Sequence, residues 1–556
     1  MKNLLKLYLV LIVFIFGCNG RNDKNSNGEI RKGGTLNIAL VNDIDSFNPV
    51  VSTDIVSGAV QDIIFPALVS MNWNDSLGYS DYEPLLASSW SELPETYSII
   101  FNLRNDVFWS DGRKVGFEDI LYSYKLYSNP ASASPQQFLF EGFYKNEKSE
   151  VDFGRSLKKL NDSSFMVIYT RKIQNPLQLA ILKIVPDNYY GSDFRKLREN
   201  SNSMNPLSAG PYLLEKWEMN QRIVLSGNNN YILGSKANID KIIFKILPDY
   251  TTRLTGLKTG EIDFMEGIKP EDVSGLKKSY PDIETISLSG RNYEFVCWSN
   301  IDHKLYRKDG QIKPHPLFGK KEIRTALALA IDREELIEGS LQGLGEVCNG
   351  PISPIFKWAF NDDLKPLAYD PGKALQILES EGWYDSNRNG ILDRQGREFS
   401  FSLFINSGSP RREFAANMIK NYLHKIGIEV KIEKLEWNLF ETKIINRELD
   451  AFINGMAVSS DINPYEFWYS DLNKASMNDA GYQNKQVDRL IETANNLDRK
   501  LSAPYWKEFQ RMIFDDQPCA FLYWYPNIIG YNKRVKNVKS NIWDSYNQIS
   551  NWWLSN

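Results

Sequence analysis

The N-terminal stretch restricts this chain more than any other part of the sequence. Lys2 and Lys6 carry positive charge, and the apolar run 7–16 that follows leads to Cys18. A helix that spans a membrane needs about 20 apolar residues, and this run is shorter than that. A positively charged start followed by a short apolar run is typical of a signal peptide. We therefore expect residues 1–17 to be removed on export and the rest of the chain to fold outside the cytoplasm.

The residues around Cys18 predict a membrane anchor. Ile15-Phe16-Gly17-Cys18 resembles the bacterial lipobox, in which a small residue precedes a cysteine that receives lipid. The resemblance implies acylation of Cys18, with palmitate-type chains, and several chains hold a protein stably where one chain holds it only marginally. Residues 18–32 are polar and predict a flexible tether. We expect a lipoprotein of the bacterial cell envelope that faces the periplasm or the exterior.

The size and charge of the chain limit its class. No later stretch of the 556 residues is apolar enough to cross a bilayer, and 42% hydrophobic residues indicate a folded protein. A chain of this length usually needs at least two hydrophobic cores, so two or more domains are expected. The formal charge of -4 argues against nucleic acid as a partner, because phosphate binding needs a basic surface.

The body of the chain predicts mixed helices and strands. Apolar residues recur at helical spacing from Glu322 to Leu341, which predicts one amphipathic helix. A second helix is expected to end at Gly427, and the alternation of apolar and charged residues from 428 to 433 predicts a strand directly after it. A helix, a glycine and a strand in such short order indicate α/β layers. Further expected strands cover 35–41, 97–104, 211–217, 222–225, 241–247 and 262–265.

The motifs of common enzymes are absent from the sequence. The three histidines show no metal-ligand spacing, and no GxSxG elbow, P-loop or dinucleotide-binding glycine pattern occurs. We therefore expect no catalytic residues and no enzyme. A hydrolase that uses two of the scattered carboxylates remains an alternative.

One loop favours a metal site. Asp385, Asn387, Asn389 and Asp393, with Gly390 at the turn, match the first part of a DxNxNG calcium loop, although Gly396 stands where the last glutamate is expected. Two neutral ligands predict weak binding. A surface turn rich in Asn, Asp and Gly explains the same residues equally well. We therefore expect no cofactor other than a structural calcium ion at this loop.

Three cysteines remain in the body of the chain. They are Cys297, Cys348 and Cys519, and because their number is odd at least one is unpaired. Export permits a disulfide bond, but the spacing does not say which two residues would form it.

Several ordered segments give the chain a family resemblance. Taken together they resemble the extracellular solute-binding proteins of family 5, the oligopeptide- and dipeptide-binding components of ABC importers. The resemblance runs from about residue 33 to 540, and the segments are 32–36, 45–49, 84–90, 101–104, 108–112, 117–120, 209–212, 257–263, 323–326, 330–333 and 369–371. No single segment is decisive, but their common order is specific to the family.

The resemblance implies a fold and a division of the chain. The fold is α/β, two-lobed and periplasmic-binding-protein-like (class II), with a subdomain inserted in lobe I and a ligand cleft between lobes that close about a hinge. The expected pieces are 33–52, 186–292 and 522–556 for lobe I, 53–185 for the inserted subdomain and 293–521 for lobe II.

The resemblance also implies a ligand and partners. A monomer is expected to bind short peptides and to deliver them to the transmembrane subunits of an ABC permease. In peptide-binding relatives an aspartate pairs with the α-ammonium of the peptide, and Asp461 matches it here. Such a charge-assisted hydrogen bond contributes about 1.5–3 kcal/mol. The competing interpretation is a helix start with Asn463 at the N-cap, Pro464 at N1 and Glu466 at N3, which leaves Asp461 free. An oligosaccharide remains the alternative ligand.

Overall fold

The computed structural model describes residues 30–173 and 175–555. The predicted signal peptide, Cys18 and most of the predicted tether lie outside these residues. Within the described ranges, no helix is both long enough and apolar enough to cross a membrane.

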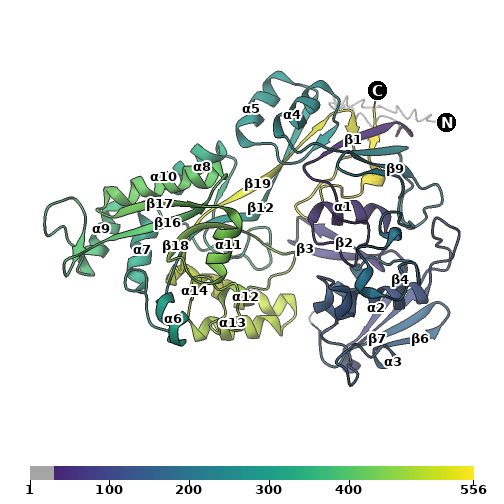
Figure 1. Cartoon of the computed structure of the whole chain (residues 1–556), viewed down its shortest axis with the longest axis horizontal. Coiled ribbons are helices and arrows are strands. Elements are labelled where there is room, and N and C mark those ends of the chain that lie inside the picture. Colours follow the sequence, from purple (N-terminus) through teal and green to yellow (C-terminus); the bar gives the residue numbers. More distant parts are fainter. Residues whose placement is uncertain (1–29, 174, 556) are drawn as a thin grey trace, which may run out of the picture.

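One eleven-stranded sheet runs through both ends of the molecule (Figure 1). Its strands are β1 (Thr35–Leu40), β8 (Tyr212–Glu218), β9 (Arg222–Gly227), β10 (Lys241–Ile246), β11 (Phe264–Met265), β12 (Ile283–Trp298), β13 (Glu346–Val347), β16 (Ser400–Asn406), β17 (Glu429–Leu435), β18 (Ala451–Ala457) and β19 (Cys519–Asn532). Their order is β17-β16-β18-β12-β19-β11-β1-β10-β9-β8, with β13 paired to β19 off this path. The predicted strands from 35 to 265 in this sheet are all present.

Two long strands join the two lobes. β12 and β19 pair antiparallel from Ile283↔Asn532 to Cys297↔Cys519, and the register shifts between Leu288 and Asn292. In Figure 1 the pair extends from the end of the molecule that holds β1 to the end that holds β16 and β18. Two hydrogen-bonded strands therefore connect the lobes, as the prediction of a two-lobed α/β fold requires.

Most of the first lobe is built on one continuous hydrophobic core. Ile38 and Ile242 from the large sheet belong to it, and so do Phe101 and Tyr124 from the smaller layers. Those layers are a four-stranded sheet, a hairpin and several short helices. Their elements are α1 (Ile55–Ile64), β2 (Val69–Asn74), β3 (Tyr79–Pro84), β4 (Ala87–Leu93), β5 (Ser98–Leu103), α2 (Phe117–Ser128), α3 (Phe153–Ser156), β6 (Leu157–Asn161), β7 (Ser164–Ile168), β20 (Val535–Lys536) and β21 (Trp553–Leu554).

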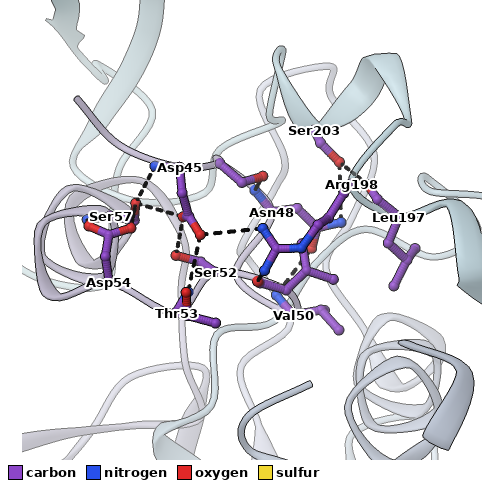
Figure 2. A network of polar contacts seen from close by, with 12 residues as sticks. Asp45, Asn48, Val50, Ser52, Thr53, Asp54, Ser57, Leu197, Arg198 and Ser203 are labelled. Carbon is purple, nitrogen blue, oxygen red and sulfur yellow. Dashed lines mark hydrogen bonds and ion pairs between the residues drawn. The ribbon is translucent and has the colours of Figure 1, made fainter. Parts of the chain in front are cut away.

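The first long loop of this lobe is held by a polar network (Figure 2). The carboxylate of Asp45 accepts hydrogen bonds from the hydroxyl groups of Ser52 at 2.8 Å and Ser57 at 2.9 Å, and from Arg198 at 3.4 Å. Burial raises the pKa of Asp45, but hydrogen bonds with Asp54, Ser52, Ser57 and the backbone N–H of Thr53 outweigh that effect, and its pKa lies below the ordinary value. The segment that joins β1 to α1 is therefore fixed although it has no regular structure.

A buried ion pair attaches the C-terminal segment to the first lobe. Asp263 is fully buried beside α4 (Tyr250–Thr259) and α5 (Pro270–Ser279), which share a small core. Both of its oxygens accept hydrogen bonds from Arg534, at 2.5 and 2.7 Å, and one also accepts the backbone N–H of Asn37 at 2.9 Å. Three distant segments therefore meet at one carboxylate.

The second lobe places helices on both faces of its part of the sheet. Val296 and Trp298 of β12 face one core, whereas Tyr293, Phe295 and Cys297 face another. The first core packs against α7 (Lys321–Leu329), α8 (Arg333–Leu341), α9 (Pro371–Ser380) and α10 (Pro410–Lys425), and the second against α11 (Trp437–Ile445), α12 (Tyr465–Trp468), α13 (Lys485–Asn495) and α14 (Arg499–Asp516). The remaining elements are α6 (His303–Asp309), β14 (Asp393–Arg394) and β15 (Arg397–Glu398).

The single helix predicted over residues 322–341 is wrong, because two helices stand there. α7 ends before Ala330, and Asp332 caps α8 by accepting the N–H of Glu335 at 3.0 Å. The break lets the buried Arg333 donate to the carbonyl oxygens of Ala328 at 2.9 Å and Phe521 at 2.6 Å. The helix end and strand predicted around Gly427 are confirmed, and that glycine has φ +78°.

Candidate ligand-binding site

Strand β18 leaves part of one edge unpaired. It pairs with β12 along its whole length, from Asn292↔Ala457 to Trp298↔Ala451. On its other side it pairs with β16 only at Phe404↔Phe452. The edge of β18 beyond Phe452 therefore has no strand partner in the described part of the chain, and an extended ligand backbone could bind there.

Asp461 lies just beyond this strand and contacts the other lobe. Its Oδ2 accepts a hydrogen bond of 3.2 Å from the side-chain amide of Asn175, which precedes a short 3-10 helix in the first lobe. The same amide donates to the hydroxyl of Tyr82 in β3 at 2.8 Å. No other hydrogen bond to the carboxylate of Asp461 is formed by the described residues. One carboxylate oxygen thus stays available to a ligand.

Helix α12 starts one residue later than the competing interpretation proposed. Pro464 is its N-cap residue and Tyr465 its first helical residue. Asn463 accepts the N–H of Tyr465 at a long 3.4 Å. The proposed positions of Asn463, Pro464 and Glu466 are therefore each wrong by one residue. Asp461 lies outside the helix in either case.

Further contacts join the lobes near Asp461. Lys172 lies 3.9 Å from the carboxylate of Asp498, and the guanidinium of Arg499 lies 3.9 Å from the ring centroid of Tyr79. Trp73 of β2 makes an edge contact with Phe356 of the second lobe, with ring centroids 5.8 Å apart. Sequence reasoning missed these residues because ordinary surface residue types, hundreds of positions apart, carry no local signal.

Two arginines lie on the other side of the sheet, at the start of α10. Arg412 donates to the fully buried Glu294 at 3.0 Å, and Arg411 donates to the same oxygen at 3.3 Å. Burial lowers the pKa of Arg411, but the adjacent Glu294 more than offsets this and holds its pKa above the ordinary value. Arg411 also stacks on Tyr525, 3.8 Å from the ring centroid. Two cations against one anion leave the group with a net positive charge.

Gly455 allows this charged group to lie against β18. A Cβ atom at this position would be 2.7 Å from a Glu294 oxygen and 3.0 Å from Arg412, so a larger residue would displace the pair. The group also lies at the carboxyl ends of the parallel strands β16 and β17, since Arg412 donates to Asn406 at 2.6 Å. In α/β sheets this end is where ligands bind. The unpaired edge of β18 thus lies beside a positive group, and Asp461 follows Gly455 by a few residues.

The residues of the predicted calcium loop meet in one turn. Asp385 accepts the N–H groups of Asn389 and Gly390, both at 3.0 Å, and Asn387 accepts the N–H of Asn389 at 3.0 Å. Asp393 accepts the N–H and the hydroxyl of Ser386 at 3.0 and 2.7 Å. The loop's own donors therefore occupy oxygens that a cation would use.

Glu398 is a carboxylate that the motif did not include. It accepts a 2.7 Å hydrogen bond from the amide of Asn389, so it lies beside the loop although Gly396 occupies the expected position. Among residues 30–173 and 175–555, no three His, Cys, Asp or Glu side chains are arranged to hold a metal.

All three cysteines of the body are free and buried. Cys297 and Cys519 are direct register partners on β12 and β19. Burial raises the pKa of Cys348 to about 12, so this thiol stays protonated at neutral pH. The sequence left open whether two of them pair, and in the structure all three are small buried side chains with free thiols.

Comparison with known proteins supplies the family. Residues 81–479 match the model of the bacterial extracellular solute-binding proteins, family 5. The chain is 27% identical to the oligopeptide-binding protein AppA of Bacillus subtilis (strain 168), over 99% of this chain and 98% of that protein. It is 24% identical to heme-binding protein A of Haemophilus influenzae, over 79% of this chain and 78% of that one.

Two solved structures have the same fold. The Bacillus subtilis AppA structure, in complex with a nonapeptide, matches with a TM-score of 0.72 and 26% identity over 95% of this chain and all of that one (100%). The periplasmic binding protein DppA from Helicobacter pylori, in complex with the peptide STSA, matches with a TM-score of 0.70 and 25% identity over 95% of this chain and 99% of that one. The matches cover nearly the whole described chain.

Proposed function

Because the chain belongs to the bacterial extracellular solute-binding proteins of family 5, a family of binding proteins rather than enzymes, we propose that it captures short peptides between its two lobes. Oligopeptide and dipeptide binders are among its relatives, and two similar structures hold peptides. The observation that carries the proposal is the unpaired edge of β18, with the charged group of Glu294, Arg411 and Arg412 against its Gly455 and with Asp461 a few residues beyond its end.

The chemistry of a peptide matches this arrangement. A short peptide has an ammonium at one end, a carboxylate at the other and a backbone that can extend a sheet edge. Asp461 would accept hydrogen bonds from the ammonium, and Arg411 would donate to the carboxylate. Water excluded between the closed lobes strengthens both contacts, because charges interact more strongly at low dielectric constant.

Mass spectrometry of ligand carried through purification, followed by titration with short peptides, tests the proposal. We expect co-purified peptides and a saturable change in tryptophan fluorescence on peptide addition. A response to oligosaccharides with none to peptides would support the sugar-binding alternative. Hydrolysis of a bound ligand by the purified protein would favour the carboxylate-dependent hydrolase.

The predicted division of the chain is kept as part of the proposal. Lobe I comprises 33–52, 186–292 and 522–556, the inserted subdomain 53–185, and lobe II 293–521. The distribution of the hydrophobic cores supports it, because residues of 293–521 fill two cores that contain almost nothing from elsewhere. In this division the chain passes between lobe I and lobe II after residue 292 and again after residue 521. These two boundaries fall inside β12 and β19.

Anchoring and delivery complete the proposal. Lipid on Cys18 would keep a monomeric receptor beside its membrane permease, and residues 18–32 would let the lobes reach it. Growth of the bacterium with radiolabelled palmitate tests the anchor. Label in the unaltered protein, and none in a Cys18→Ser variant that appears in the soluble fraction, is the expected result. Equal labelling of both proteins would exclude Cys18 as the lipid site.

A further inference from the structure

A small cavity lies inside the second lobe, next to the segment that carries Asp461. Its volume is about 20 Å³, which is enough for one water-sized group. Tyr293, Phe295 and Phe521 form an aromatic wall, and Met456 and Met477 line it as well. Methionine side chains adapt their shape easily, so a slender ligand group can enter between them.

One carboxylate, that of Asp479, lines this cavity. No hydrogen-bond donor or ion-pair partner reaches the carboxylate from the described residues; only the backbone N–H of Asp479 is bonded, to Met477 at 2.9 Å. Arg447 is near enough to influence its charge, but that guanidinium donates to the carbonyl of Asn478 at 2.5 Å. The thiols of Cys297 and Cys519 also line the cavity, but they are only weak donors, so an anion there is costly. Burial accordingly raises the pKa of Asp479 to about 7.

The cavity belongs to the same segment as the candidate peptide site. Met456, near the end of β18, precedes Asp461 in the chain, and Phe467 of α12 follows it. Both residues line the cavity. Figure 1 places α12 on the side of the second lobe that faces the first. Met477 is 46% exposed, so one wall reaches the surface. A peptide held at Asp461 would present a nearby side chain to this cavity.

We propose that the cavity is a side-chain subsite that takes the ammonium end of a long unbranched side chain, as in lysine, with Asp479 as its counter-ion. The inference rests on the proposed peptide-binding function and names one class of peptide within it. An ammonium is the size of one water molecule and donates three hydrogen bonds, whereas the planar guanidinium of arginine is larger than the cavity. The methylene stem would pack against the methionines and the aromatic wall.

Tripeptides that differ in one side chain test this subsite on the full-length protein. Lysine, its uncharged isostere norleucine, arginine and glutamate are placed in turn at each position, and binding is measured by tryptophan fluorescence. At one position we expect lysine to bind at least about tenfold more tightly than norleucine, because a desolvated charge-assisted hydrogen bond forms. Arginine and glutamate should bind more weakly than lysine there.

Variants then assign the preference to Asp479. In Asp479→Asn, lysine and norleucine should bind alike, and norleucine should bind as in the unaltered protein, which also shows that the variant folds. Asp471 is a half-buried carboxylate of the same loop that pairs with Lys474 and does not line the cavity, so Asp471→Asn should keep the lysine preference.

Three results would overturn the inference. If norleucine peptides bind the unaltered protein as tightly as lysine peptides do, the cavity does not recognise the ammonium group. This result does not depend on whether any variant folds. A lysine preference that persists in Asp479→Asn would place the counter-ion elsewhere. If no peptide of any composition binds, the proposed function itself fails and the subsite with it.

Discussion

The side-chain amide of Asn175 donates a 3.2 Å hydrogen bond to the carboxylate of Asp461, a residue 286 positions further along the chain. The contact crosses from one lobe to the other. The carboxylate that resembles the ammonium-binding residue of peptide binders is therefore also a point where the lobes meet. Ligand binding and lobe closure would be coupled through this one side chain, because both change its hydrogen bonds.

Substitution at Asp461 separates these two roles. Asp461→Asn keeps an oxygen for Asn175 but loses the charge, so we expect peptides with a free amine to bind about 10- to 100-fold more weakly, and N-acetylated peptides to bind as before. Asn175→Ala, which keeps the charge, should weaken both kinds of peptide by a similar, smaller factor. Fluorescence titration measures both. Equal binding of free and acetylated peptides to the unaltered protein would contradict the role given to Asp461.

Arg411 should hold the opposite end of the ligand. Arg411→Ala is expected to weaken peptides with a free carboxylate by at least about tenfold and to have little effect on C-terminal amides. Lys434→Ala serves as the control, because Lys434 is a nearby cation that already pairs with Glu413 at 2.8 Å on the surface. If acids and amides are weakened equally, Arg411 supports the fold and does not contact the ligand.

The Asp263–Arg534 pair should be important for stability. Arg534→Ala leaves the fully buried Asp263 without its counter-ion, and we expect the free energy of unfolding to fall by about 3 kcal/mol. The ion pair of Lys245 and Glu261 lies at the surface, with its nitrogen and oxygen 3.2 Å apart. Lys245→Ala should therefore lower the free energy of unfolding by less than about 1 kcal/mol. Urea unfolding followed by circular dichroism measures both changes. A loss at Arg534 no larger than that at Lys245 would mean that the buried carboxylate is satisfied without it.

His303 should make the protein less stable in acid. Burial, with Arg447 nearby, lowers its pKa from 6.5 to about 4, and its Nε2 has no partner among the described residues. Below pH 6.5 the unfolded chain binds a proton that the folded protein does not. Stability contributed by the neutral ring is therefore complete above pH 6.5 and is lost as the pH falls to about 4, by up to about 3 kcal/mol.

Comparison with His303→Gln isolates this contribution from the other acidic groups. Urea unfolding at several pH values between 4 and 7 should show a steeper loss of stability for the unaltered protein than for the variant. Parallel curves would indicate that the pKa of His303 is the same in both states.

The Asp385 loop offers a direct metal test. If it binds calcium, the ion at about ten times its dissociation constant should raise the melting temperature by about 2–4 °C relative to EDTA. Asp385→Asn should abolish the increase, and magnesium should not replace calcium. A melting temperature that calcium does not change would leave the loop as a turn held by its own hydrogen bonds.

Local patterns in the sequence predicted much of the second lobe. Alternation from 428 to 433 and the glycine at 427 correctly predicted β17 and the end of α10, because both depend on a few adjacent residues. The break between α7 and α8 was missed, although Asp332 followed by acidic residues is a helix-start signal. Apolar residues recur at helical spacing without interruption from 323 to 337, and this pattern predicted a single helix.

The candidate site, like the fold, was predictable from the sequence only in part. The sequence by itself determined which segment carries the candidate carboxylate, the loop that gathers Asp385 with its neighbours, and the α/β class, because each of these is recorded in a short run of residues. Only the tertiary structure decided that Asn175 reaches Asp461, that Glu294 binds Arg411 and that Cys297 faces Cys519. These contacts depend on how segments more than a hundred residues apart pack together, and no local pattern specifies that packing.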